Sequence, residues 1–221
     1  TIHPDAGGDG TVSMNVLIIE DNKYMQDFFA GMFRSDARFG EVNTLRDAAQ
    51  GLYFCTVNHV DLILMDVQTL HGHSGLTASQ QIRAQFPRIR IVVVTSLVDA
   101  LVLDKARHAG VDSLWYKDHG EQELMDVVNR TLAGEHIFPD REPNVEIGEA
   151  WSDELSEMQK NILRLYIRGN SYSAIAQKLF IEQATVKYHM KEMIQKCGFQ
   201  SKQELVAAAI ESTVITSMAE L

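Results

Sequence analysis

The chain has 221 residues, a hydrophobic content of 45% and a formal net charge of −10, values that suit one or two globular domains. No apolar stretch approaches the roughly 18 residues that a membrane-spanning helix needs, and residues 1–13 have neither the basic start nor the apolar core of a signal peptide. The charge is uneven, because residues 1–150 carry a net charge of −10 and residues 151–221 carry none, so the acidic total does not exclude nucleic acid binding by the last third.

The start of the chain and its two cysteines carry little functional signal. Residues 1–13 are expected to be a flexible leader, or an expression remnant in front of a natural start at Met14. Cys55 and Cys197 lie far apart, each in an apolar helical pattern. This placement predicts buried free thiols in a reducing cytosol and not a disulfide.

Short apolar runs alternate with amphipathic helical patterns from residue 14 to about residue 134. The helical patterns have apolar residues three and four positions apart, as in Met25, Phe28 and Phe29. Strands rich in Val, Ile and Leu between such helices indicate a parallel sheet covered on both faces, an α/β fold. The predicted strands are residues 15–20, 41–45, 61–66, 90–96 and 113–117.

The pattern changes after residue 134. Residues 134–152 hold two of the four prolines, many charges and no periodicity, which predicts a linker. From Ser152 onward only helical patterns follow, with two capping-box sequences, SEMQ at 156–159 and SKQE at 201–204. The expected limits are 14–135 for the first domain, 136–152 for the linker and 153–221 for a small all-α domain. The predicted helices are about 156–168, 171–178, 183–196 and 202–212.

Polar side chains stand at the carboxyl ends of the predicted strands, where an open parallel sheet binds its ligands. Three close carboxylates repel one another unless a cation joins them, and oxygen ligands of this kind suit Mg²⁺. A lysine and a hydroxyl at the same edge suit a phosphoryl group. A Glu-Asp pair after a strand is also a common helix N-cap, which is the alternative role of Glu20 and Asp21. The residues are Glu20, Asp21, Asp66, Thr95, Ser96 and Lys117.

This arrangement over about 120 residues resembles the receiver domain of two-component response regulators, which implies a flavodoxin-like, doubly wound, five-stranded parallel sheet. By the resemblance, Asp66 is the phosphoacceptor, and Mg²⁺ is bound by Glu20, Asp21, Asp66 and the backbone carbonyl of Gln68. The resemblance further implies that Thr95 is the switch residue and that Lys117 pairs with the phosphoryl group.

Two segments depart from the receiver pattern. The loop after Asp66 usually has proline at its fourth position and glycine at its eighth, whereas here Leu70 is fourth and Gly75 is ninth. The aromatic switch partner usually stands three residues before the lysine, where this chain has Leu114. The expected consequence is an altered readout or lifetime of the phosphoryl state. His71 and His73 in the loop are predicted to be solvent-exposed, because no third soft metal ligand is near in sequence.

Residues 184–199 form the most informative stretch of the second domain. Val186, Met190, Met193 and Cys197 make one apolar stripe, and the opposite face carries Lys187, Tyr188, Lys191 and Gln195. A short helix and a tight turn precede this helix, as in a helix-turn-helix that enters the major groove. Lysines reach phosphates, and Tyr and Gln can touch bases or sugars.

Residues 155 to about 210 resemble the LuxR-type helix-turn-helix of NarL/FixJ-class response regulators, above all in "IA..L", "TVK.H" and the K-x-G ending. By position, Lys187, Tyr188 and Lys191 would face DNA, and Thr185 would contact phosphate. The family's Pro-Arg-Glu is Glu157-Met158-Gln159 here, which removes the charges of one family-typical ion pair.

The sequence therefore predicts a cytoplasmic transcription regulator, not an enzyme, that binds promoter DNA as a homodimer and makes no membrane contact. A sensor histidine kinase or a small phosphodonor would phosphorylate Asp66. One alternative is regulation without phosphorylation, with the receiver serving only for dimerisation. A remote alternative is an aspartate-nucleophile phosphohydrolase, which usually needs a second Asp where this chain has Gln68.

Overall fold

The computed structural model describes residues 13–117 and 121–215, so most of the predicted leader lies outside the described residues. Within them, five strands form one parallel sheet in the order β2-β1-β3-β4-β5. The predicted doubly wound fold is thus confirmed, with strand limits within about two residues of those expected. The strands are β1 (Met14–Ile19), β2 (Phe39–Leu45), β3 (Leu62–Asp66), β4 (Arg90–Thr95) and β5 (Ser113–Tyr116).

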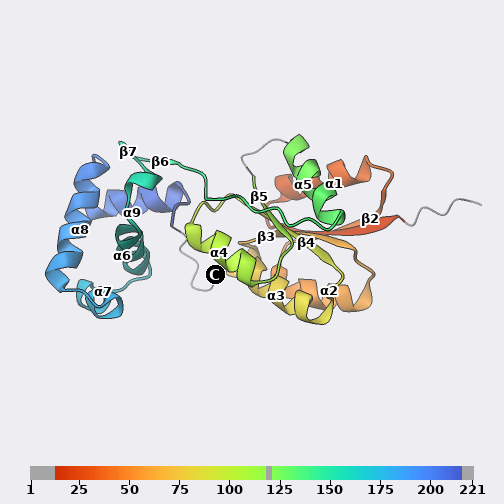
Figure 1. The fold of residues 1–221 in the computed structure, drawn as a ribbon, viewed down its shortest axis with the longest axis horizontal. Helices are drawn as coiled ribbons and strands as arrows, with labels where there is room; N and C mark the ends of the chain where they lie inside the picture. Colours follow the sequence, from red (N-terminus) through yellow and green to blue (C-terminus); the bar gives the residue numbers. More distant parts are fainter. Residues whose placement is uncertain (1–12, 118–120, 216–221) are drawn as a thin grey trace, which may run out of the picture.

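Helices cover both faces of the sheet (Figure 1). The central strands are buried along their whole length, as β3 is from Leu62 to Asp66, which explains their unbroken apolar sequences. The helices α1 (Lys23–Arg34) and α5 (Glu121–Leu132) pack on one face. The other face carries α2 (Gly51–Val57), α3 (Gly75–Gln85) and α4 (Ala100–His108).

The second domain is helical and contains one small hairpin that the sequence did not reveal. Strands β6 (Glu146–Ile147) and β7 (Ala150–Trp151) lie within the segment predicted as a linker. Ile147 and Ala150 are buried, and the amide of Glu149 donates to the carbonyl of Cys197 at 3.0 Å, so the hairpin is part of the helical core. The helices are α6 (Glu157–Ile167), α7 (Tyr172–Leu179), α8 (Gln183–Lys196) and α9 (Lys202–Glu211).

Local signals explain where these helices begin and end. Ser156 and Gln159 form the predicted capping box at the start of α6. Gly169 and Gly198 follow α6 and α8 with φ of 81° and 74°, the left-handed conformation that glycine adopts at helix ends. Both cysteines are buried free thiols, as predicted.

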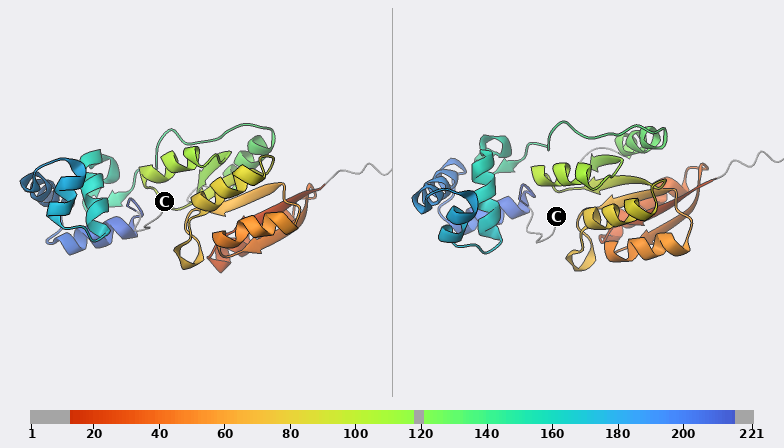
Figure 2. Two further views of the ribbon diagram at one scale, coloured as in Figure 1. Left: turned by 90° about the horizontal axis from the view of Figure 1, so that it is seen from below. Right: turned by 60° about the horizontal axis from the view of Figure 1, so that its bottom comes forward.

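The two domains share one apolar cluster. Buried residues on the α2–α4 side of the sheet continue through Leu97 and Val98 to Val214 and Ile215, and from there into the core of the helical domain. The segment that follows α9 therefore lies against the β4–α4 loop, between the domains in all three views (Figures 1 and 2). No helix in the described part of the chain is long and apolar enough to cross a membrane.

Candidate functional site

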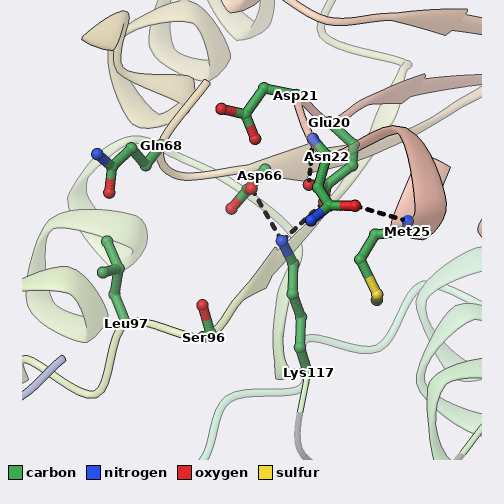
Figure 3. Close-up of a pocket in the computed structure, with 9 residues that line it drawn as sticks. All are labelled: Glu20, Asp21, Asn22, Met25, Asp66, Gln68, Ser96, Leu97 and Lys117. Carbon is green, nitrogen blue, oxygen red and sulfur yellow. Dashed lines mark hydrogen bonds and ion pairs between the residues drawn. The ribbon is translucent and has the colours of Figure 1, made fainter. Parts of the chain in front are cut away.

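A pocket of about 300 Å³ opens at the carboxyl ends of the strands (Figure 3). At its floor the ammonium group of Lys117 lies between two carboxylates, 2.8 Å from Asp66 Oδ2 and 2.7 Å from Glu20 Oε2. Asp66 ends β3, Glu20 follows β1 and Lys117 follows β5. Parallel strands bring these ends to one edge of the sheet, so the chain topology assembles the group.

The Glu20-Asp21 pair is not a helix cap. The N-cap of α1 is Asn22, whose side-chain oxygen accepts hydrogen bonds from the amides of Tyr24 and Met25. Glu20 is instead buried, and one of its oxygens accepts from the Asn22 amide at 3.1 Å. Both acids are therefore available to the pocket.

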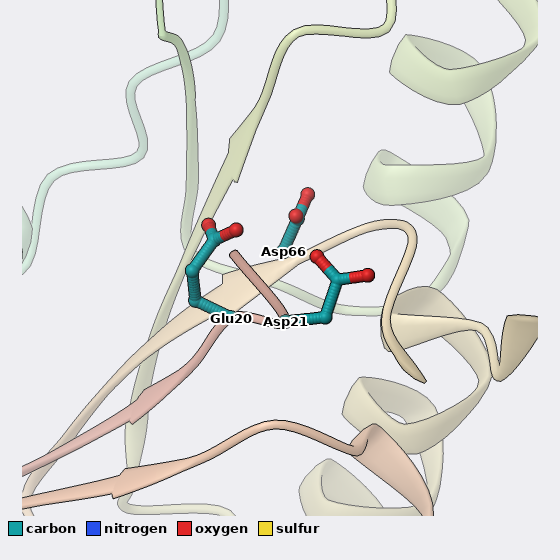
Figure 4. Close-up of side chains that lie close together, drawn as sticks. All are labelled: Glu20, Asp21 and Asp66. Atoms are coloured by element: carbon teal, nitrogen blue, oxygen red, sulfur yellow. The ribbon is translucent and has the colours of Figure 1, made fainter. Parts of the chain in front are cut away.

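Three carboxylates converge in this pocket, those of Glu20, Asp21 and Asp66, with oxygen atoms that all lie within 4.8 Å of one another (Figure 4). One lysine leaves the group with a net negative charge if all three acids are ionised. A small divalent cation with oxygen ligands relieves that repulsion, and Mg²⁺ prefers such ligands together with retained waters. The cluster fits a Mg²⁺ site.

Burial dominates the electrostatics of Asp66. Its removal from water, aided by the nearby charge of Glu20, raises the pKa of Asp66 to about 7, although Lys117 acts in the opposite direction. The two carboxylates in turn raise the pKa of Lys117 despite its burial, so the lysine stays charged. A buried carboxylate that is costly to ionise and faces a cation in a pocket is a candidate for a reactive group.

Thr95 ends β4 as predicted, and its hydroxyl oxygen contacts the local backbone. The side chain is fully buried, and its oxygen accepts a hydrogen bond from the amide of Leu97 at 3.1 Å. Ser96, Leu97 and Gln68 also line the pocket (Figure 3). Leu97 was not predicted as a site residue, since nothing in an isolated leucine distinguishes it from core.

The second domain presents the predicted surface helix. On α8, Val186, Met190 and Met193 are buried with Cys197 just beyond, which confirms the apolar stripe. The opposite face is solvent-exposed at Lys187, Tyr188, Lys191 and Gln195, and Thr185 is half-buried near the start of the helix. In each view α8 lies on the side of the domain away from the sheet (Figures 1 and 2).

Two family models match the chain in the same order as its domains. The response regulator receiver domain matches residues 16–129, and the luxR family of bacterial regulatory proteins matches residues 153–209. The chain is a response regulator with a LuxR-type DNA-binding domain. It belongs to the NarL/FixJ class of transcription factors, which are not catalytic enzymes, so the phosphohydrolase alternative is excluded.

Known response regulators are similar over nearly the whole chain. The response regulator protein VraR of Staphylococcus aureus is 26% identical over 216 residues, which is 92% of this chain and all of VraR. A structure of two RcsB dimers bound to two parallel DNAs has a TM-score of 0.60 at 18% identity, covering 92% of this chain and all of that one. An RcsB structure from Salmonella typhimurium has a TM-score of 0.52 at 17% identity, with 88% and 97% coverage. The structural likenesses establish the fold.

This response regulator has Leu114 at the position usual for the aromatic switch partner, and an aromatic residue, Tyr116, stands two residues later. Leu114 and Tyr116 point to the same face of β5, and both are buried in the cluster shared by the domains. Among the described residues, the Tyr116 hydroxyl has no hydrogen-bond partner. Burial and the nearby charges of Glu142 and Asp99 raise the pKa of that phenol well above its usual range.

At the start of α6, Gln159 makes a contact that the sequence did not predict. Gln159, buried where the family has Glu, donates from its side-chain amide to Glu192 of α8 at 2.8 Å. The family's carboxylate at this position would repel Glu192, so the neutral amide makes a contact that an acid would not. This hydrogen bond joins α6 to α8.

Polar contacts reinforce the junction between the domains. Arg164 of α6 pairs with Asp99, the N-cap of α4, with its NH2 atom 2.6 Å from Oδ1, and the two side chains are 5% and 0% exposed. Beyond α9, the hydroxyl of Thr213 donates to the carbonyl of Ser96 at 2.7 Å, and the Thr213 carbonyl accepts from the Val98 amide at 3.2 Å. The residues directly after Thr95 are thus held by the DNA-binding domain.

Proposed function

We propose that this response regulator is phosphorylated on Asp66 with Mg²⁺ as cofactor, by a cognate sensor histidine kinase or a small phosphodonor in the cytoplasm. The observation that carries this proposal is the cluster of Glu20, Asp21 and Asp66, three carboxylates within 4.8 Å of one another, with Lys117 at hydrogen-bond distance from two of them. Glu20, Asp21, Asp66 and the backbone carbonyl of Gln68 would hold the metal.

The residues of the pocket divide the chemistry between them. An ionised Asp66 oxygen attacks the phosphorus of the donor, the bond from phosphorus to the leaving group breaks, and the leaving group departs with the electron pair. Lys117 holds a positive charge beside the oxygens that become more negative, and Mg²⁺ supplies further positive charge when bound. Because Asp66 resists ionisation, metal binding and deprotonation of Asp66 favour each other.

The phosphoryl group would be read through the β4–α4 loop. We expect Thr95 to donate to a phosphoryl oxygen on Asp66, and a rotation of its side chain toward Asp66 would weaken the bond that its oxygen accepts from the Leu97 amide. Leu97 lines the pocket and also belongs to the cluster shared by the domains. A shift of this loop would disturb the contacts of Ser96 and Val98 with Thr213, so the open arrangement of the domains gains population.

DNA would be contacted by α8. The proposed contacts are Lys187 and Lys191 to phosphates or base edges, Tyr188 to bases or sugars, and Thr185 to phosphate at the helix start. A single helix offers few base contacts, so a homodimer on paired half-sites of a promoter supplies the affinity. The proposed domain limits are residues 14–135 for the receiver and 153–221 for the DNA-binding domain, to which the hairpin at 146–151 also belongs.

A second candidate function is DNA binding that does not depend on phosphorylation, with the receiver used for dimerisation. The observations in its favour are Leu114 in place of the aromatic switch partner and Leu70 in place of the loop proline. Tyr116, on the same face as Leu114, weakens this case because it offers a buried aromatic ring next to Lys117.

Phosphorylation with acetyl phosphate, followed on a gel that retards phosphoproteins, separates the two candidates. The expected result is a retarded band that requires Mg²⁺, is lost with EDTA and is absent in Asp66→Asn. Analytical ultracentrifugation and DNA binding before and after phosphorylation then test the coupling. A protein that stays unmodified, and that binds DNA equally well as Asp66→Asn, supports the second candidate.

A further inference from the structure

The loop after Asp66 has a rigid turn of its own, although it lacks the usual proline. The backbone amide and the hydroxyl of Thr69 both donate to the carbonyl of His73, at 3.2 and 2.8 Å. Between them, His71 and Gly72 adopt left-handed φ angles of 62° and 75°. A left-handed histidine is uncommon, so the surrounding contacts must hold this turn closed.

The turn is fastened to the segment that follows β2. Thr69 is buried, and its hydroxyl accepts from the amide of Ala48 at 3.0 Å. His73 Nδ1 lies 2.7 Å from Asp47 Oδ1, and Asp47 is itself buried. Burial raises the pKa of Asp47, but the hydrogen bonds with the Ala49 amide and His73 lower it by more. We call Thr69, His73 and Asp47 the clasp.

The clasp joins both sides of the acidic pocket. On one side, Gln68 directly precedes Thr69 and forms a bridge with Ser74. On the other side, Arg46 directly precedes Asp47, and its guanidinium donates twice to the backbone carbonyl of Asp21, at 3.0 and 3.1 Å. Displacement of the clasp therefore moves the backbone next to two proposed metal ligands.

From this geometry we propose that His73 and Asp47 are positioning residues that set the divalent-cation affinity of the pocket, by holding Gln68 and Asp21 in register. The proposal rests on the proposed function. The clasp performs the task of a rigid proline turn, which accounts for the extra loop residue and for Leu70. His71 lies outside it, exposed to solvent. The sequence alone does not indicate this role, because the partner of His73 is 26 residues away.

The test is the Mg²⁺ dependence of phosphorylation in the full chain. We expect His73→Ala to raise the half-saturating Mg²⁺ concentration about tenfold, the lower end of the effect of losing a supporting partner around a metal site. The maximal rate at saturating Mg²⁺ should stay within about twofold, because the nucleophile and Lys117 are unchanged. His73→Gln, which keeps a hydrogen-bond donor, should restore most of the affinity.

A matched control removes a different His-Asp pair from the same domain. His59 lies 3.1 Å from Asp61 before β3, at the opposite end of the sheet. His59→Ala should leave the Mg²⁺ dependence unchanged. Asp47→Ala added to His73→Ala should raise the half-saturating concentration little further if the two residues act through each other. Additive effects, or equal effects of His73→Ala and His59→Ala, would overturn the proposal.

Direct calorimetric titration with Mg²⁺ separates this inference from the proposed function. If the native protein binds Mg²⁺ but is not phosphorylated, the proposed function fails, and the comparison of His73→Ala with the native protein still decides on the clasp. If His73→Ala proves too unstable to titrate, His73→Leu removes the polar contact with Asp47 and loses less volume. Equal Mg²⁺ affinities of the native protein and of the variant without that contact would refute the clasp.

Discussion

Replacement of Arg164 by methionine should open the domain junction. The substitution keeps most of the side-chain volume and removes the charge, so Asp99 loses its buried partner. Asp99 keeps its hydrogen bond from the Leu101 amide, which preserves the cap of α4. Burial of the Asp99 carboxylate without Arg164 is costly, whereas separation of the domains returns it to water.

The magnitude follows from the burial of this pair. Removal of one partner from a fully buried ion pair costs about 3–5 kcal/mol, because the other charge stays buried without that partner. The two side chains of Asp99 and Arg164 are 0% and 5% exposed, so solvent screening reduces the cost little. A cost of about 3 kcal/mol shifts an equilibrium about 150-fold, enough to turn a junction that is 99% closed into one that is mostly open.

Small-angle X-ray scattering of the native protein and of Arg164→Met measures this shift as a larger radius of gyration. Arg130→Met on α5 is the control, since that arginine is half-exposed and its ion pair with Glu135 is screened by solvent. Adding Asp99→Asn to Arg164→Met removes the carboxylate charge from the junction and should partly restore the closed arrangement of the domains. An unchanged radius in Arg164→Met would refute the reasoning.

Three further outcomes are expected. Burial raises the pKa of Asp66 to about 7 from 3.8. Ionisation of Asp66 therefore destabilises the fold increasingly as the pH rises through that range. Without Mg²⁺, Asp66→Asn should stabilise the protein by about 2 kcal/mol more at pH 8 than at pH 5, measured by thermal melting. Lys187→Ala should weaken DNA binding and reduce the salt slope by about one unit in anisotropy titrations at several salt concentrations, while Gln195→Ala leaves the slope unchanged. Gln159→Glu should destabilise the helical domain by about 1–3 kcal/mol in urea unfolding, because it places a buried carboxylate beside Glu192; unchanged stability would contradict the contact described here.

Local patterns predicted the elements and the acidic pocket because each signal lies within a few residues. The apolar run from Leu62 ends in Asp66, and the rule that ligands bind beyond the strand ends brings it to Glu20 and Lys117 without knowledge of any contact. The strand order alone was therefore enough to predict that Lys117 lies beside Asp66. The hairpin at 146–151 escaped notice, since strands of two residues have no periodicity.

Contacts between distant segments had no such signal. Asp99 and Arg164 are 65 positions apart. In the sequence alone, Asp99 looks like a helix cap and Arg164 looks like a surface arginine. Likewise, His73 was predicted to be a solvent-exposed loop histidine, and it is half-exposed, but its pairing with Asp47 depends on how the turn after β2 packs. Such pairs are fixed by tertiary packing, which the spacing of residues along the chain does not encode.

The apolar cluster shared by the domains has a consequence for the lifetime of the protein. While Val214 and Ile215 stay packed with Leu97 and Val98, loss of one domain removes support from the other, so the chain should melt and be degraded as one cooperative unit. Once the junction opens, each half depends on its own smaller core and exposes a chain segment to proteases. Turnover of the activated regulator would then be faster than that of the resting one, so the signal would limit its own duration.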